Sequence, residues 1–79
     1  MARVSWTRED DLLVCTSYLA NGTSVTDALR AAVPAHEAGS IGMRLQNFEY
    51  LATDGASGLA NTAAQTREVW DTVQRLRKG

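Results

Sequence analysis

Five side chains within one short stretch of the chain have the chemistry needed to bind duplex DNA. The stretch covers residues 39–52, and the candidates are Met43, Arg44, Gln46, Asn47 and Tyr50. An amide side chain can pair in bidentate fashion with adenine, and a guanidinium can hold guanine or a phosphate. We therefore predict Asn47 and Gln46 as base-reading residues and Arg44 as the anchoring cation. Met43 and Tyr50 would add apolar or stacking contacts.

The spacing of apolar residues predicts a helix over residues 40–52. Ile41, Leu45 and Phe48 fall at i, i+4 and i+7, which places them on one narrow stripe of a helix. With that stripe against a core, the opposite side faces water or a ligand, as in a recognition helix in a major groove. The alternative is that Met43 and Tyr50 pack under a neighbouring loop, because large residues at helical spacing often belong to a core.

Length and composition indicate a single folded domain spanning residues 1–79. The hydrophobic fraction is 44 % and the charged fraction 22 %, which is ordinary for a globular domain. No apolar run approaches the roughly 20 residues that a membrane span needs, and the N-terminus lacks a signal-peptide core. Cys15 is the only cysteine, so it cannot form an intramolecular disulfide. We expect a cytoplasmic protein with no membrane segment.

The net charge of −1 is unusual for a DNA-binding domain, whose affinity for phosphates normally comes from a basic excess. The charges are nevertheless unevenly distributed. Acidic residues concentrate at residues 9–11, while Arg75, Arg77 and Lys78 lie near the C-terminus. A polarised surface is therefore compatible with the overall balance. These basic residues also suit the negative pole of a helix dipole. The alternative to a DNA contact by them is a solvated end of the helix.

Start and stop signals predict the remaining helices. Thr7 with Asp10 three residues later forms a capping-box pattern for a helix over residues 8–20, which Asn21-Gly22 ends. Ser24 repeats the start signal for a helix over residues 24–33, which Pro34 ends. Thr62 and Gln65 predict another capping box and a helix over residues 62–77.

This order of elements predicts an all-α fold, a small helix-turn-helix-like bundle of three helices with a C-terminal fourth helix. One core is expected to hold the larger apolar residues, with Cys15 on the buried face of the first helix as an unreactive packing thiol. His36 is expected to be a solvated loop residue. The predicted core residues are Trp6, Leu12, Leu19, Leu29, Ile41, Leu45, Phe48, Trp70 and Val73.

Two stretches resemble known helical modules. The residues Arg-Val-Ser-Trp-Thr-Arg-Glu-Asp-Asp-Leu at 3–12 resemble the tryptophan-plus-acidic start of Myb-like domains, whose first helix packs a tryptophan into the core. The run Ser-Ile-Gly-Met-Arg-Leu-Gln-Asn-Phe-Glu-Tyr-Leu at 40–51, with Gly-Leu-Ala-Asn at 58–61 and the later Trp70, is similar to the helical module ahead of HNH nuclease domains in some restriction-type endonucleases.

The resemblance covers about residues 3–70 and has two departures. Glu49 and Ala52-Thr53 stand where a small residue and a tighter aspartate-containing turn are expected, and the nuclease half is missing from this chain. The resemblance therefore implies DNA recognition or targeting without cleavage.

Catalysis is not expected, because one histidine and no serine or cysteine with an evident base leave no nucleophile and base pair. Asp10 and Asp11 are adjacent, so on a helix they point about 100° apart and cannot act on one substrate bond. We expect no metal and no cofactor. A Cys/His zinc site within one chain is excluded by the presence of a single residue of each kind.

The sequence thus predicts a non-catalytic protein that reads double-stranded DNA with the helix at 40–52. A homodimer or a larger protein partner is also predicted, because two half-sites multiply the affinity of a small domain. The alternative function is a small phage-like or accessory module that binds a protein partner through the same helix, since methionine, tyrosine and arginine are also favoured at protein interfaces.

Overall fold

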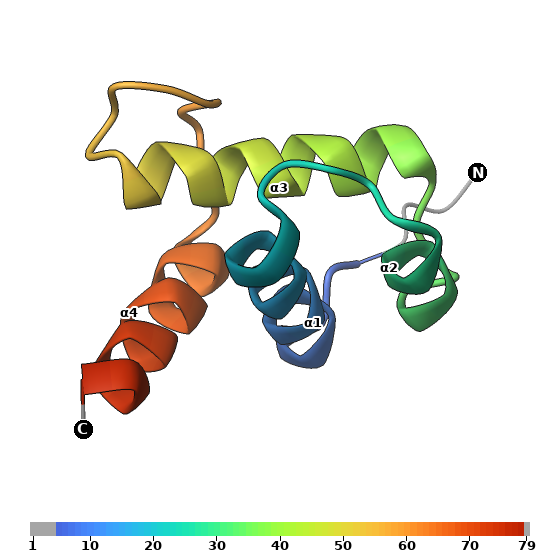
Figure 1. Cartoon of the computed structure of the whole chain (residues 1–79), viewed down its shortest axis with the longest axis horizontal. Helices are drawn as coiled ribbons and strands as arrows, with labels where there is room; N and C mark the ends of the chain where they lie inside the picture. Colours follow the sequence, from blue (N-terminus) through green and yellow to red (C-terminus); the bar gives the residue numbers. More distant parts are fainter. Residues whose placement is uncertain (1–4, 79) are drawn as a thin grey trace.

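Residues 5–78 are described by the computed structural model, and within them the chain forms four helices (Figure 1). They are α1 at Arg8–Asn21, α2 at Asp27–Ala32, α3 at Ala38–Ala52 and α4 at Ala64–Lys78. No strand occurs in this part of the chain, so the predicted all-α fold is confirmed. Arg3 and Val4, with which the Myb-like stretch opens, lie outside the described residues. None of the helices within 5–78 has the length and apolar character that crossing a bilayer requires.

The ends of α1 follow the predicted signals. The Asp10 amide donates to Thr7 Oγ1 at 3.0 Å, and the Thr7 amide donates to the Asp10 carboxylate at 3.2 Å, which completes the capping box. At the other end Gly22 has φ +67°, a conformation that glycine adopts without steric cost, and its amide donates to the Tyr18 carbonyl. Local interactions, a side-chain cap at the start and a glycine backbone conformation at the end, therefore fix both ends of this helix.

The starts of α2 and α4 differ from the prediction. The cap of α2 is Thr26, not Ser24, and its hydroxyl accepts from the Leu29 amide at 3.0 Å. This later start leaves Val25 in the extended segment, where it packs against the core. The predicted Thr62–Gln65 box does not form, because Thr62 Oγ1 accepts from the Arg67 guanidinium and Gln65 donates to groups outside α4.

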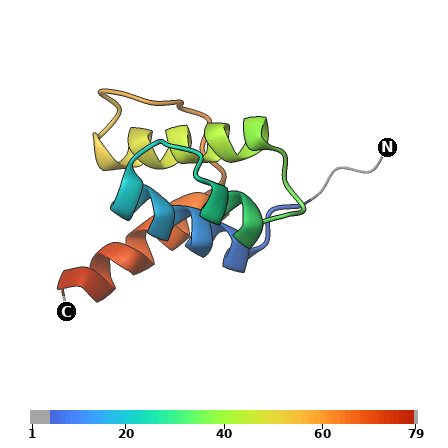
Figure 2. The same cartoon turned by 45° about the vertical axis from the view of Figure 1, so that its right-hand side comes forward.

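α1 is the central helix of the bundle, and it contacts each of the other three. In Figure 1, α3 lies across the top of α1 and α4, while α2 packs beside α1. Figure 2 shows the same arrangement turned, with the loop that follows α3 running back over that helix before α4 begins. A short α2 and a crossing α3 thus enclose one face of α1.

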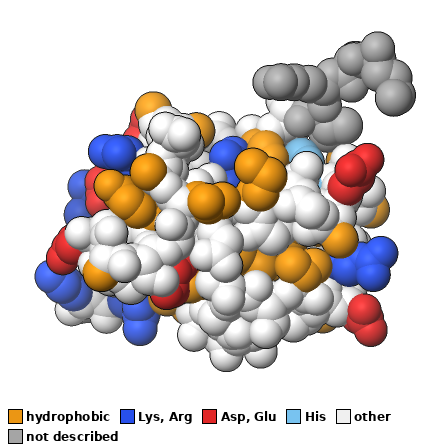
Figure 3. All heavy atoms as spheres, turned by 90° about the horizontal axis from the view of Figure 1, so that it is seen from above, with side chains coloured by type: hydrophobic (Ala, Val, Ile, Leu, Met, Phe, Trp, Pro, Cys, Tyr) orange, Lys and Arg blue, Asp and Glu red, His pale blue; other side chains and the backbone are white. Residues whose placement is uncertain are grey.

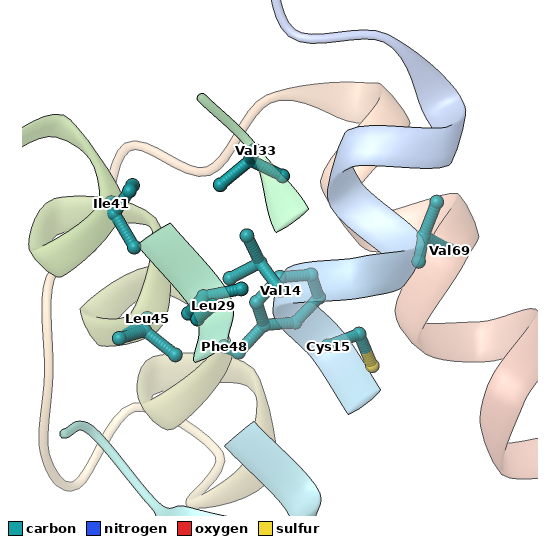
Figure 4. Close-up of a cluster of buried hydrophobic side chains, with 8 residues drawn as sticks. All are labelled: Val14, Cys15, Leu29, Val33, Ile41, Leu45, Phe48 and Val69. Carbon is teal, nitrogen blue, oxygen red and sulfur yellow. The ribbon is translucent and has the colours of Figure 1, made fainter. Parts of the chain in front are cut away.

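The core is built around Phe48, which is fully buried (Figure 4). Leu29, Ile41 and Leu45 are also buried, as predicted, while the predicted Trp6, Trp70 and Val73 pack at its edge and are partly buried. The complete set of buried hydrophobic residues is Val14, Cys15, Leu29, Val33, Ile41, Leu45, Phe48 and Val69.

The prediction that Leu12 and Leu19 belong to the core is wrong, since they are 38 % and 37 % exposed. The buried face of α1 instead carries Asp11, Val14 and Cys15, at the i, i+3 and i+4 spacing of a helical stripe. A charged residue at the first position of this stripe hides it from a search for apolar periodicity. The burial of Asp11 therefore rotates α1 relative to the orientation predicted from its leucines.

Replacing Phe48 with alanine should lower the free energy of unfolding by about 3–5 kcal/mol, because it opens a cavity at the centre of the core. Urea denaturation followed by circular dichroism measures this loss. Leu19→Ala is the matched control and should cost less than about 1.5 kcal/mol, because its side chain is only partly covered. Equal losses in the two variants would contradict this core.

Candidate functional site

Arg44, the predicted anchoring cation, points from α3 to a carboxylate on α1. Its Nε donates to Asp11 Oδ1 at 2.7 Å and its Nη2 donates to Asp11 Oδ2 at 3.2 Å. The Asp11 side chain is fully buried, and the Arg44 side chain is only 13 % exposed. A buried carboxylate needs such a partner, because removing one member of the pair leaves an uncompensated charge. The guanidinium is thus engaged within the chain.

Gln65 on α4 completes the coordination of the same carboxylate. Its Nε2 donates to Asp11 Oδ2 at 2.7 Å and to the Trp6 carbonyl at 2.9 Å. Four segments of the chain therefore meet at Asp11, namely the residues before α1, α1 itself, α3 and α4. We call Trp6, Asp11, Arg44 and Gln65 the Asp11 cluster.

His36 lies beside this cluster and not in solvent, so the prediction of a solvated loop histidine is wrong. Its ring stacks on the Trp6 ring with 3.7 Å between centroids, and its side chain is 3 % exposed. Its Nε2 lies 3.0 Å from Asp10 Oδ2, and this hydrogen bond lowers the pKa of Asp10. The Arg44 guanidinium lies 4.7 Å from the Trp6 ring centroid, within the range of a cation–π contact. Stacking on Trp6 therefore draws the α2–α3 connector against the N-terminal segment.

Asn47, predicted to read a base, is used to hold the loop that follows α3. Its Nδ2 donates to the carbonyl oxygens of Leu59 and Ala60 at 3.0 and 3.1 Å. The Leu59 amide donates to the Gln46 carbonyl at 3.0 Å, so the loop is tied to α3 from both sides. Asn47 therefore links α3 to the loop through two hydrogen bonds.

Gly58 permits this close approach of loop and helix. It has φ +93°, and a Cβ placed on it would lie 2.3 Å from the Gln46 carbonyl oxygen and 2.6 Å from the Tyr50 nitrogen. No other residue type fits these contacts without moving the loop. The Gly-Leu-Ala-Asn sequence at 58–61 thus has a packing role against α3.

Tyr50 supports the alternative of packing under a neighbouring loop. A Cβ on Gly55 would touch its ring at 3.3 Å, and the Gly55 amide donates to the Tyr50 carbonyl at 2.9 Å. Tyr50 and Gln46 are both half-buried. Met43 is different, since its side chain is 62 % exposed.

The outward side of α3 and its loop forms one surface, which we call the α3–loop face and define as Met43, Gln46, Tyr50 and Leu59. Leu59 belongs to it because its amide is bonded to the carbonyl of Gln46, one turn after Met43, and it is 44 % exposed. Figure 3 looks onto this side of the molecule, where several hydrophobic side chains are exposed and charged side chains also reach the surface, mostly toward the edges of the view. The face is chiefly apolar.

The remaining chemistry-bearing residues have packing roles. Asp10 and Asp11 bond to different partners, His36 and Arg44. Cys15 is a fully buried free thiol, and burial raises its pKa to about 11, so it stays protonated at neutral pH. No group of three or more His, Cys, Asp or Glu residues within 5–78 is placed to hold a metal ion.

Sequence reasoning missed the Asp11 cluster as a unit. Asp11 and Arg44 are 33 positions apart, and no local signal connects them. The one available sign was the position of Asp11, which shares a helical stripe with Val14 and Cys15.

Comparison with family models, curated proteins and solved structures gave no match for the chain.

Two substitutions test the packing of the loop against α3, one at the Asn47 hydrogen bonds and one at the close approach of Gly58. Asn47→Ala should cost about 1–2 kcal/mol of unfolding free energy, because two carbonyl groups lose their donor. Gly58→Ala should cost more, because its Cβ would overlap the backbone of α3. Gly39→Ala is the control, since a Cβ on Gly39 meets nothing within 4 Å. If thermal denaturation showed Gly58→Ala to be as stable as Gly39→Ala, the close packing of the loop on α3 would be disproved.

Proposed function

We propose that this chain is a non-catalytic protein-binding module and that the α3–loop face is its contact surface. The observation that carries the proposal is the exposure of Met43, at 62 %, on a helix whose neighbouring polar side chains are engaged within the chain. Leu59, whose amide is bonded to the Gln46 carbonyl of the same helix, is 44 % exposed and adds a second large apolar side chain to this face.

The internal roles of Arg44 and Asn47 weigh against base reading by α3. To contact DNA, Arg44 would leave the buried Asp11 without its partner, a change that costs about 3–5 kcal/mol in comparable pairs. Asn47 would likewise leave the Leu59 and Ala60 carbonyls without their donor. Few DNA contacts could offset both losses, since a good bidentate base contact contributes about 1–3 kcal/mol.

The chemistry of the α3–loop face suits a protein partner. Methionine adapts its shape to irregular surfaces, and methionine and tyrosine are enriched in protein interfaces. A net charge of −1 imposes no penalty on such an interface, whereas it disfavours approach to a phosphate backbone. Apolar contact, with Gln46 supplying a hydrogen-bonding group, is therefore the mode of binding that we propose.

Duplex DNA binding is the second candidate, and a separate observation favours it. Arg75, Arg77 and Lys78 are all exposed in the last turn of α4. Three neighbouring cations could contact phosphates without disturbing the Asp11 cluster. Such binding would be independent of base sequence, because phosphate contacts carry no sequence information directly.

Site-specific crosslinking separates these candidates. Benzoylphenylalanine in place of Met43 should form an adduct with a protein in extracts of the organism that makes this chain, and the same probe in place of the exposed Arg30 should not. Leu59→Glu should abolish the adduct, because a charge on the α3–loop face opposes its burial. The fold of each variant is checked by circular dichroism.

Binding to DNA is measured by fluorescence anisotropy, with a duplex of random sequence of about 20 base pairs at low and at high salt. Our proposal predicts that Met43→Glu leaves any duplex binding unchanged. The outcome that would overturn it is the absence of an adduct at position 43, together with salt-sensitive duplex binding that is lost in Arg75→Glu/Arg77→Glu.

A further inference from the structure

The two sulfur-containing residues within 5–78 lie in opposite environments. Cys15 is fully buried in the core cluster, where Figure 4 shows it on α1, whereas the Met43 side chain is 62 % exposed on α3. Oxidation of either sulfur by a dissolved oxidant requires that the oxidant reach it. The fold therefore exposes one sulfur to oxidants and encloses the other.

The chemistry of the two groups widens this difference. Burial raises the pKa of the Cys15 thiol to about 11, so at neutral pH it holds almost none of the thiolate that reacts with oxidants. The Met43 thioether does not titrate and stays reactive at every pH. An oxidant at neutral pH therefore modifies the α3–loop face before it modifies the core.

An oxygen atom added to Met43 leaves the contacts of α3 intact. This helix contributes Ile41, Leu45 and Phe48 to the core, and Met43 is not among the side chains packed there. Its neighbour Arg44 remains bonded to Asp11 whether or not Met43 carries oxygen. The modification thus changes the surface of the α3–loop face without unfolding the helix that presents it.

We propose that Met43 is a redox-sensitive contact, and that its oxidation by a peroxide releases the protein partner of the α3–loop face. This inference rests on the proposed function. The peroxide O–O bond breaks, one oxygen bonds to Met43 Sδ, and the other leaves as water when the oxidant is hydrogen peroxide. The sulfur loses two electrons and the peroxide gains them.

The sulfoxide opposes binding because its polar oxygen costs free energy when it is buried against an apolar partner surface. The change is reversible, since methionine sulfoxide reductases return two electrons and two protons and release the oxygen as water. Oxidation of Met43 therefore switches the chemistry of the α3–loop face between apolar and polar.

Peptide mapping by mass spectrometry tests the selectivity without any partner. With hydrogen peroxide at neutral pH, Met43 in the folded chain should gain oxygen within about twofold of its rate in the urea-unfolded chain. Cys15 should react at least about tenfold more slowly folded than unfolded. The circular dichroism of the oxidised chain should match that of the untreated chain. A Met43 as protected as Cys15, or a loss of helix on its oxidation, would overturn the proposal.

Crosslinking tests the effect on binding. Two chains carry benzoylphenylalanine in place of Leu59, one with Met43 and one with Met43→Leu, which keeps an apolar side chain that peroxide does not oxidise. Each chain is treated with peroxide, freed of it, and added to a desalted extract of the organism that makes it. Treatment should lower the adduct yield of the Met43 chain at least about tenfold. Methionine sulfoxide reductases should restore that yield.

The Met43→Leu chain is the matched control, because it retains Met1 and both tryptophans. Its adduct should survive the treatment. Equal losses in the two chains, or an adduct that persists on the chain oxidised at Met43, would overturn the redox role and leave the proposed function standing. The absence of an adduct from both untreated chains would instead overturn the proposed function, and the redox role with it.

Discussion

The fold depends on the burial of one carboxylate and on the guanidinium that neutralises it. Asp11 is fully enclosed, and without Arg44 its charge would face an apolar interior at a cost of several kcal/mol. The pair fixes the rotation of α1 and the position of α3 along it. Gln65 then ties α4 to the same point, and Trp6 covers the guanidinium. One interaction thus relates three helices that are distant in sequence.

Local signals predicted most of the elements. The Thr7 cap, Asn21-Gly22 and the apolar stripe of Ile41, Leu45 and Phe48 act within a few residues, so the sequence alone was enough to place α1 and α3. The rotation of α1 could not be predicted in the same way. Its buried stripe includes Asp11, whose burial is possible only because of Arg44 on another helix, and periodicity analysis therefore favoured Leu12 and Leu19.

The candidate site shows the same limit. Arg44 and Asn47 have side chains suited to a ligand, but Asp11 and the Leu59 carbonyl occupy them, and the turn at Gly55 covers part of the Tyr50 ring. Glu49 is engaged in the same way, because it accepts a hydrogen bond from the Tyr18 hydroxyl at 2.6 Å, and burial together with this bond raises the pKa of Tyr18 to about 12. A sequence shows which side chains could bind, whereas their internal partners become visible only in the fold. Met43 remains exposed, and our functional proposal therefore centres on it.

A double-mutant cycle between Asp11 and Arg44 tests the central claim most directly. Arg44→Met keeps the apolar stem but leaves the carboxylate unpaired, so it should cost about 3–5 kcal/mol in urea denaturation. Asp11→Asn introduced into that variant removes the unpaired charge and should recover at least about 2 kcal/mol, which measures a strong coupling between the two residues. If the two substitutions were additive, or if Arg44→Met unfolded no more easily than the wild type, the ion pair would not hold the fold together.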